Sequence, residues 1–277
     1  MGLFNSRLID PEVVEWQFQY FEWLIDNFSS AAGLPDSELW RPIPEHYSPV
    51  SRGKRSLTGR PLAKHIFETV KRQCHFGPEQ TIRLVPTQES KPQHLGGVAM
   101  VQTNEAGACG RYKLSKNEDG SFTETITYDE DLTENPTQLI ATFAHELGHA
   151  LHNRSQRPVE IEVELYEMFT DLTAIYLGFG IFVANTRFEF SQFQDANLQG
   201  WQANGAGYLP EADIVFATAL FMKIKNIPES VAAEHLKPRL RKTLHKAFKQ
   251  LSKHEEDVDA LRMRMPVAIQ SLDSSAS

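Results

Sequence analysis

Residues 145–149 read His-Glu-Leu-Gly-His, which is the pattern H-E-x-x-H. Residues four apart lie one above the other on one face of an α-helix, so His145 and His149 can reach the same metal ion if this segment is helical. Glu146 can then lean over a metal-bound water and serve as its general base. The pattern therefore requires a helix with one face open to a metal, and the rest of the chain must pack around it.

The residues around the pattern predict that it lies on a buried amphipathic helix. Asn135 is a favoured N-cap residue, and Pro136 follows at the first helical position. From that start, apolar residues recur at helical spacing at Leu139, Ile140, Phe143, Leu147, Ala150 and Leu151. These signals and an acidic segment close behind argue against a chance match, and we interpret the pattern as a metal site.

A zinc site built for hydrolysis has three protein ligands and an open position for water, so a third ligand must come from another segment. The segment 158–171 predicts a helix that opens at Pro158. It carries an acidic stripe at helical spacing, formed by Glu160, Glu164, Glu167 and Asp171. Such a stripe is normally a solvated face of a helix.

From Phe169 onward, however, the same segment is mostly apolar, and a carboxylate buried there needs a partner. We predict that Glu167 binds the metal. Asp171, one turn later, is predicted to accept the second ring N–H of a ligand histidine. Glu164 is the competing candidate for the third ligand.

H-E-x-x-H followed by E-x-x-x-D at Glu167 and Asp171 resembles the gluzincins, which are the thermolysin-like zinc peptidases and their minimal relatives. The resemblance covers residues 120–185. It implies a zincin-like fold, with zinc held by His145, His149 and Glu167. It also implies that Glu146 is the catalytic base and that Asp171 supports the first histidine.

The metzincin class of zinc peptidases fits the sequence less well. That class has a glycine three residues after the second histidine and a third histidine three residues further on. This chain has His152 and Ser155 at those positions. We therefore interpret His152 as a supporting or surface histidine and not as the third ligand.

Composition narrows the class of protein and of partner. The hydrophobic share of 41% suffices for a core, and the net charge is −8, from 28 basic and 36 acidic residues. Without a basic cluster interleaved with aromatic residues, nucleic acid is not expected as a direct partner. No uninterrupted apolar stretch reaches the roughly 18 residues of a membrane span, and no charged-then-apolar leader opens the chain, so we expect a soluble cytoplasmic protein.

Two smaller features complete this picture. Cys74 and Cys109 form no C-x-x-C pair, and we expect them to be free thiols. Residues 1–6 match the loose pattern for N-myristoylation at Gly2, a modification that would matter only in a eukaryotic host.

The rest of the chain predicts an α+β fold that is mostly helical. Residues 1–60 form an N-terminal helix (11–30) and a connecting segment, and 61–277 form a zincin-like metallopeptidase domain with C-terminal helices; the two parts can also be one continuous domain. A small twisted, largely antiparallel sheet is expected to pack on the H-E-x-x-H helix, with strands over 81–86, 96–103, 110–114 and 122–128. Further helices are predicted over 61–74, 172–184 with a break at Gly178 and Gly180, 211–225, 228–235 and 238–251. Residues 186–207 form a lid or are disordered, and 272–277 are disordered.

These features predict a zinc-dependent metallopeptidase that acts on a peptide or protein substrate through a metal-activated water, with Glu146 as general base. An additional donor to the oxyanion is expected. Tyr208 is the first candidate for it, followed by His235 and His245. The alternative is a partner-binding regulatory metalloprotein whose proteolysis is vestigial or restricted to a single substrate.

Overall fold

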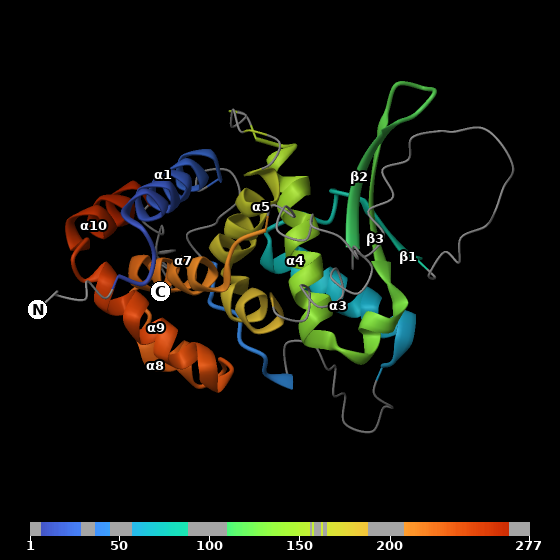
Figure 1. The fold of residues 1–277 in the computed structure, drawn as a ribbon. Coiled ribbons are helices and arrows are strands. Elements are labelled where there is room, and N and C mark those ends of the chain that lie inside the picture. Colours follow the sequence, from blue (N-terminus) through green and yellow to red (C-terminus); the bar gives the residue numbers. More distant parts are fainter. Residues whose placement is uncertain are drawn as a thin grey trace, which may run out of the picture.

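The computed structural model describes residues 7–28, 37–44, 57–87, 110–155, 157, 162, 165–187 and 208–265. Helices account for most of these residues, and a small sheet lies at one side of the molecule (Figure 1). The predicted α+β class is confirmed. Gly2, Cys109, the strand predicted over 96–103, the segment 188–207 and the C-terminal 272–277 lie outside the described residues.

The elements follow one another in a simple order. The first half contains α1 (Pro11–Phe28), α3 (Gly59–Gln73), β1 (Ile82–Thr87), β2 (Gly110–Lys116), β3 (Phe122–Asp129), the short 3-10 helix η2 (Glu130–Glu134) and α4 (Pro136–His152). The second half contains α5 (Tyr166–Ala174), the π-helical turn η4 (Ile175–Phe179) with a helix that continues to residue 187, α7 (Glu211–Ile224), α8 (Glu229–Ala233), α9 (Pro238–Leu251) and α10 (Glu255–Arg264).

The sheet is mixed and has the strand order β1-β3-β2. Strands β2 and β3 form the expected antiparallel hairpin, in which Gly110 pairs with Tyr128. Strand β1 joins β3 in parallel, which the local sequence pattern does not reveal. On β3, Ile126 and Tyr128 are buried beneath the sheet, which packs on α4 as predicted.

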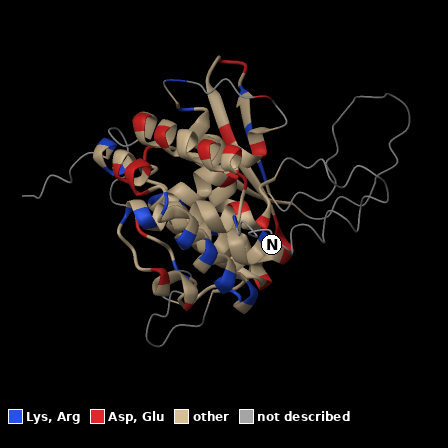
Figure 2. Ribbon diagram, turned by 60° about the vertical axis from the view of Figure 1, so that its left-hand side comes forward, with Lys and Arg blue, Asp and Glu red and all other residues tan. Residues whose placement is uncertain are grey.

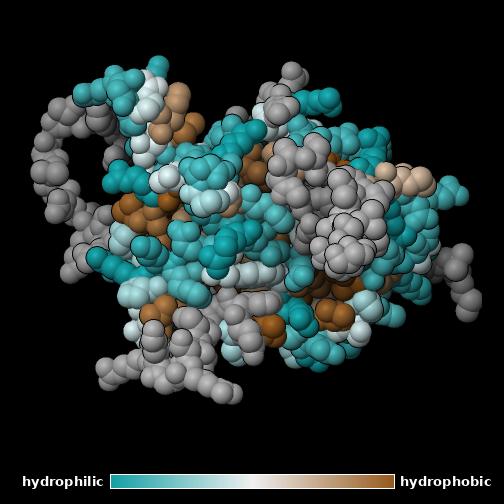
Figure 3. Space-filling view, turned by 180° about the vertical axis from the view of Figure 1, so that it is seen from behind, coloured by the Kyte–Doolittle hydropathy of each residue, from teal (hydrophilic) through white to brown (hydrophobic). Residues whose placement is uncertain are grey.

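The β2–β3 hairpin projects beyond the body of the protein (Figure 1). Its two strands meet in a turn at residues 117–120, where Gly120 adopts a φ of 84°. Leu114 and Phe122 lie on the hairpin and are 44% and 63% exposed, and apolar surface is visible along it in Figure 3. The hairpin therefore offers apolar surface to solvent above the layer that holds α4.

Helix α4 forms as the sequence predicts. The Asn135 side chain accepts a hydrogen bond from the Gln138 N–H, and Pro136 occupies the first turn. Phe143 and Leu147 are fully buried. In Figure 1 the helix lies between the sheet and α5, so one face of α4 packs on the sheet and another packs on α5.

Helix α5 begins at Tyr166, with Leu165 as its N-cap, so the predicted start at Pro158 is wrong. Pro158, Glu160 and Glu164 lie outside the described residues.

The predicted break after α5 is present at Gly178. This glycine has a φ of 97°, and its carbonyl oxygen accepts a hydrogen bond from the Trp40 N–H at 2.9 Å. A Cβ at this position would lie 2.0 Å from the carbonyl oxygen of Glu38. Glycine is therefore needed here for its conformation and also for the close approach of the 37–44 segment.

Among the described residues, one helix, Tyr166–Arg187, is long and apolar enough to cross a membrane. Within its most apolar window, however, 89% of the residues are buried inside the protein, as they are in the core helix of many globular proteins. The segment supplies the centre of the core, with Leu172, Leu177 and Phe182 fully buried.

Helix α9 is strongly amphipathic. Leu240, Leu244 and Leu251 face the core, whereas the basic side chains Arg239, Arg241 and Lys242 are exposed. Figure 2 shows Lys and Arg side by side on these outer helices. These three basic residues therefore form a solvated face of the helix.

Helix α1 packs on the same core as the rest of the chain and reaches the helices of the H-E-x-x-H region. The Tyr20 hydroxyl lies 2.7 Å from His152 Nε2 and 2.8 Å from Thr173 Oγ1, and the latter two atoms are 2.7 Å apart. One buried polar triad therefore joins α1, α4 and α5. Burial, together with the nearby His149 and His145, lowers the pKa of His152 to about 3.

We predict that protonation of His152 destabilises the fold. Its native pKa of about 3 lies below the value of about 6.5 expected in the unfolded chain. Its contribution to stability is therefore complete above pH 6.5 and is lost as the pH falls from there towards 3. In urea denaturation, wild type should lose stability relative to His152→Gln by about 1.4 kcal/mol per pH unit below about pH 6. Parallel pH profiles of the two proteins would contradict the prediction.

Candidate metal centre

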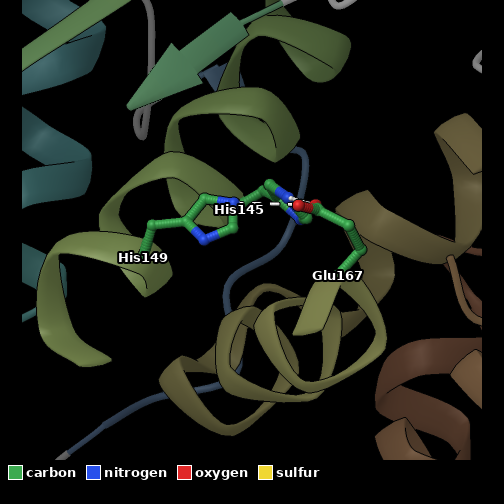
Figure 4. Close-up of side chains that lie close together, drawn as sticks. All are labelled: His145, His149 and Glu167. Carbon is green, nitrogen blue, oxygen red and sulfur yellow. Dashed lines mark hydrogen bonds and ion pairs between the residues drawn. The ribbon is translucent and has the colours of Figure 1, made fainter. Parts of the chain in front are cut away.

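Three side chains from two helices converge on one point (Figure 4). His145 and His149 project from α4, and Glu167 projects from the first turn of α5. Glu167 Oε2 lies 2.9 Å from His145 Nε2 and 3.6 Å from His149 Nε2. One ligand atom from each of the three residues can be chosen so that all three atoms lie within 4.8 Å of one another.

This spacing fits a divalent metal. Zinc–ligand bonds of 2.0–2.1 Å in a tetrahedral arrangement keep two ligand atoms roughly 3.4 Å apart. The distances of 2.9 and 3.6 Å bracket that value. Two imidazoles and one carboxylate are also a donor set that zinc and other first-row metals accept, so the trio can hold a metal without a change of fold.

Asp171 holds His145 in place, as predicted. The Nδ1–H of His145 donates to Asp171 Oδ1 at 2.9 Å, which turns Nε2 towards Glu167. The second oxygen, Oδ2, accepts a hydrogen bond from the backbone N–H of Leu209 at 3.1 Å. A single buried carboxylate therefore fixes both a histidine of the trio and the chain that enters α7.

Thr170 orients the second histidine of the trio, His149, and the sequence analysis did not predict this role. Its hydroxyl donates to the Tyr166 carbonyl oxygen at 2.9 Å, and Oγ1 lies 3.2 Å from His149 Nδ1. The oxygen can therefore accept from the Nδ1–H of His149, which leaves Nε2 available for a metal. The only sequence signal for Thr170 was its position between Glu167 and Asp171 on the same helix.

Gly148 allows α4 and α5 to approach closely enough for this geometry. A Cβ at this position would lie 3.1 Å from Thr170 Cγ2 and 3.3 Å from the Thr170 carbonyl oxygen. A side chain at residue 148 would therefore require Thr170 to give way by a few tenths of an ångström. Thr170 lies on the same helix as Glu167.

The electrostatics of the trio favour a positive charge between the carboxylates. Burial alone lowers the pKa of His145, but its hydrogen bonds to Asp171 and Glu167 outweigh this and raise it to about 10. Burial raises the pKa of Glu167, yet hydrogen bonds to His145 and His149 hold it well below its usual value. Paired carboxylates that stabilise a proton in this way also stabilise a metal cation.

Glu146 is buried beside the trio but is not part of it. Only 6% of the residue is exposed, and burial raises the pKa of its carboxyl group. The backbone N–H of Tyr112, on β2, donates a hydrogen bond to this carboxylate. At the start of the same strand, a Cβ on Gly110 would lie 3.2 Å from Glu146 Oε1, so the glycine keeps space open in front of the carboxylate.

That space belongs to a cavity alongside His145 and Glu146. Its other lining residues are Gly110, Ala141, Thr142, Asp171, Val183, Thr186, Arg187 and Tyr208. The Tyr208 ring centre lies 5.7 Å from that of His145, so this predicted residue does reach the site. His235 and His245 are not among the lining residues, and His245 lies on the surface with a 71% exposed side chain beside Glu229.

Arg187 is one of the lining residues that the sequence did not indicate. It is the last described residue of the helix that continues α5, and its guanidinium lies over the Tyr208 ring, 4.8 Å from the ring centre. The sequence placed it in an irregular segment from 186 to 207, where no periodicity indicated which way its side chain points. His152, by contrast, takes no part in the trio, in agreement with its interpretation.

Comparison of the chain with family models, curated proteins and solved structures finds no match. The resemblance to gluzincins therefore depends on His145, Glu146, His149, Glu167 and Asp171 themselves.

We predict that the purified protein retains about one zinc ion per chain after mild dialysis and that Glu167→Ala loses it, because two imidazoles alone leave the site short of a ligand. Elemental analysis measures the metal content. Glu164→Ala is the matched comparison and should keep its zinc. Loss of zinc in Glu164→Ala with retention in Glu167→Ala would reverse the assignment of the third ligand.

Asp171→Asn should weaken zinc binding by about 10- to 100-fold, because the amide lacks the charge that supports His145 and presents an N–H2 group to either His145 or Leu209. Competition with a chelating dye measures the dissociation constant. Asp259→Asn, at an exposed position of α10, provides the control and should bind zinc as wild type does. Equal affinities for all three proteins would show that Asp171 does not support the ligand.

Proposed function

We propose that the protein is a zinc-dependent metallopeptidase of the gluzincin type. The observation that carries the proposal is the position of a buried carboxylate, Glu146, beside the trio of His145, His149 and Glu167 and on the wall of an adjoining cavity. A structural zinc site has four protein ligands and needs neither an additional base nor a cavity. Three ligands with a base alongside are the arrangement expected for hydrolysis.

When bound, a zinc ion would lower the pKa of a coordinated water and polarise the substrate carbonyl. In the proposed reaction, Glu146 accepts the proton of the attacking water and then delivers it to the leaving amine. Burial supports this role because it raises the pKa of the carboxyl group towards neutrality, where a group exchanges protons most effectively. The hydrogen bond from the Tyr112 N–H fixes the orientation of the carboxylate.

The edge of the sheet supports a peptide as the substrate. Strand β2 pairs with β3 on one side only among the described strands, and it passes Glu146 at Gly110 and Tyr112. Tyr112 also lies near the trio, since its ring is stacked at 6.4 Å from that of His149. An extended peptide can add to such an edge as another strand, which would carry its backbone past Glu146.

Tyr208 remains the proposed donor to the oxyanion. Its ring is tilted against that of His145, and the neighbouring Leu209 N–H is held by Asp171. A phenolic hydroxyl fixed near the reacting carbonyl can stabilise negative charge as it develops there. The residue would then act in the transition state and not in metal binding.

We predict that Glu146→Gln keeps its zinc and loses peptidase activity by a factor of about 100 to 10,000, the range that general acid–base catalysis supplies. The assay is the release of new amino termini from a pool of end-blocked peptides, with metal content measured in parallel. Glu118→Gln, in the exposed turn of the hairpin, is the control and should match wild type.

Activity in Glu146→Gln close to that of wild type would disprove the mechanism. Wild type that holds zinc but cleaves none of the pool would instead favour the partner-binding metalloprotein.

A further inference from the structure

The cavity beside Glu146 is lined by a guanidinium group as well as by His145. Ala141 and Val183 form apolar walls, and Gly110 contributes no side chain. Among the described residues that line it, Arg187 is the only lysine or arginine. A guanidinium group in so confined a space disfavours an apolar group beside it, because the buried charge would then lack a polar partner.

Arg187 is held where it can meet a ligand. Its guanidinium lies over the Tyr208 ring, which positions the group by a cation–π contact. Burial lowers the pKa of Arg187, and the charge of Asp171 favours its cationic form. An arginine is protonated in proteins, so Arg187 carries a positive charge here. A guanidinium has five N–H donors, which is more than a single carboxylate accepts.

A second polar group in the cavity points to the same kind of ligand. Thr142 lines the cavity, is 2% exposed, and its Oγ1 has no hydrogen-bond partner among the described residues. A buried hydroxyl without a partner costs stability, unlike that of Thr186, which donates to the Phe182 carbonyl oxygen. Thr142 therefore has a hydrogen-bond donor to offer to a group that enters the cavity.

The carboxylates of the cavity already accept hydrogen bonds from the chain. Asp171 accepts from His145 and Leu209, and Glu146 accepts from the Tyr112 N–H. An anion that enters the cavity can accept hydrogen bonds from Arg187 and from Thr142 at once.

We propose that this cavity, the Arg187 pocket, selects substrates that present a carboxylate next to the scissile bond. The inference rests on the proposed function and names its substrate class. The carboxylate comes either from an acidic side chain or from a free C-terminus, since both have the same planar pair of acceptor oxygens. A planar guanidinium recognises such a pair with two parallel hydrogen bonds.

The test uses the zinc-loaded full chain and three pools of random heptapeptides. The first two pools are blocked at both ends and differ only in having Glu or Gln at the central position. The third has Gln at the centre and a free C-terminal carboxylate. We expect wild type to cleave the Glu pool or the free-carboxylate pool at least about 10-fold faster than the blocked Gln pool, which is the range that a hydrogen bond to a charged group supplies. Mass spectrometry locates the cleaved bond relative to the carboxylate.

Substitution of Arg187 separates charge from shape. In Arg187→Met the ratio between the favoured pool and the blocked Gln pool should fall to about 1. Arg187→Lys should retain only part of the preference, because it keeps the charge and loses the paired hydrogen bonds. Arg83→Met, at an exposed position of β1, should leave the ratio unchanged. Equal cleavage of all three pools by wild type, or a preference that survives in Arg187→Met, would overturn the proposal.

Binding provides a measurement that does not depend on turnover. In zinc-loaded Glu146→Gln, the favoured peptides should bind at least about 10-fold more tightly than the blocked Gln peptides, and Arg187→Met in that background should abolish the difference. Tight, Arg187-dependent binding without cleavage in wild type would refute the peptidase and retain the carboxylate pocket. Cleavage without any preference would retain the peptidase and refute the pocket.

Discussion

The close contact of α4 and α5 across Gly148 is the constraint on which the rest of the structure depends. It brings Glu167 within reach of two histidines on the neighbouring helix, and it places Thr170 and Asp171 behind their rings. The other layers then have little freedom. The sheet covers the opposite face of α4, and α1 closes the back of the pair through the Tyr20 triad. The site is thus built on rigid helices and supported from both sides, which is how a reactive arrangement keeps its geometry.

The sequence predicted the parts of this arrangement that depend on helical periodicity. His145 could be placed relative to His149, and Glu167 relative to Asp171, because a helix fixes the direction of every side chain from its position in the sequence. The start of α5 was missed because acidic residues at helical spacing do not show where a helix begins, whereas Asn135 and Pro136 did so for α4. The parallel pairing of β1 was missed because strand order and direction depend on contacts between distant segments, which alternation within one strand does not encode.

The supporting residues of the site were the hardest to predict, for a related reason. Arg187 and Thr142 are ordinary residues in sequence, and they gain significance only because a cavity lies between them and Glu146. A cavity is a property of packing, so neither composition nor motif spacing reveals it. Glu146 shows both cases. Its place on α4 follows from the motif. Its burial and its hydrogen bond from the Tyr112 N–H depend on packing against β2, which the motif does not specify.

Asp171 has a consequence of a different kind, because its two oxygens join groups that belong to different parts of the molecule. One oxygen holds the imidazole of His145, and the other holds the backbone of Leu209, next to Tyr208. A ligand that moved the chain at 208–209 would therefore also act on the carboxylate that holds His145. If the two sites are coupled in this way, thermodynamic reciprocity requires each to change the affinity of the other by the same factor.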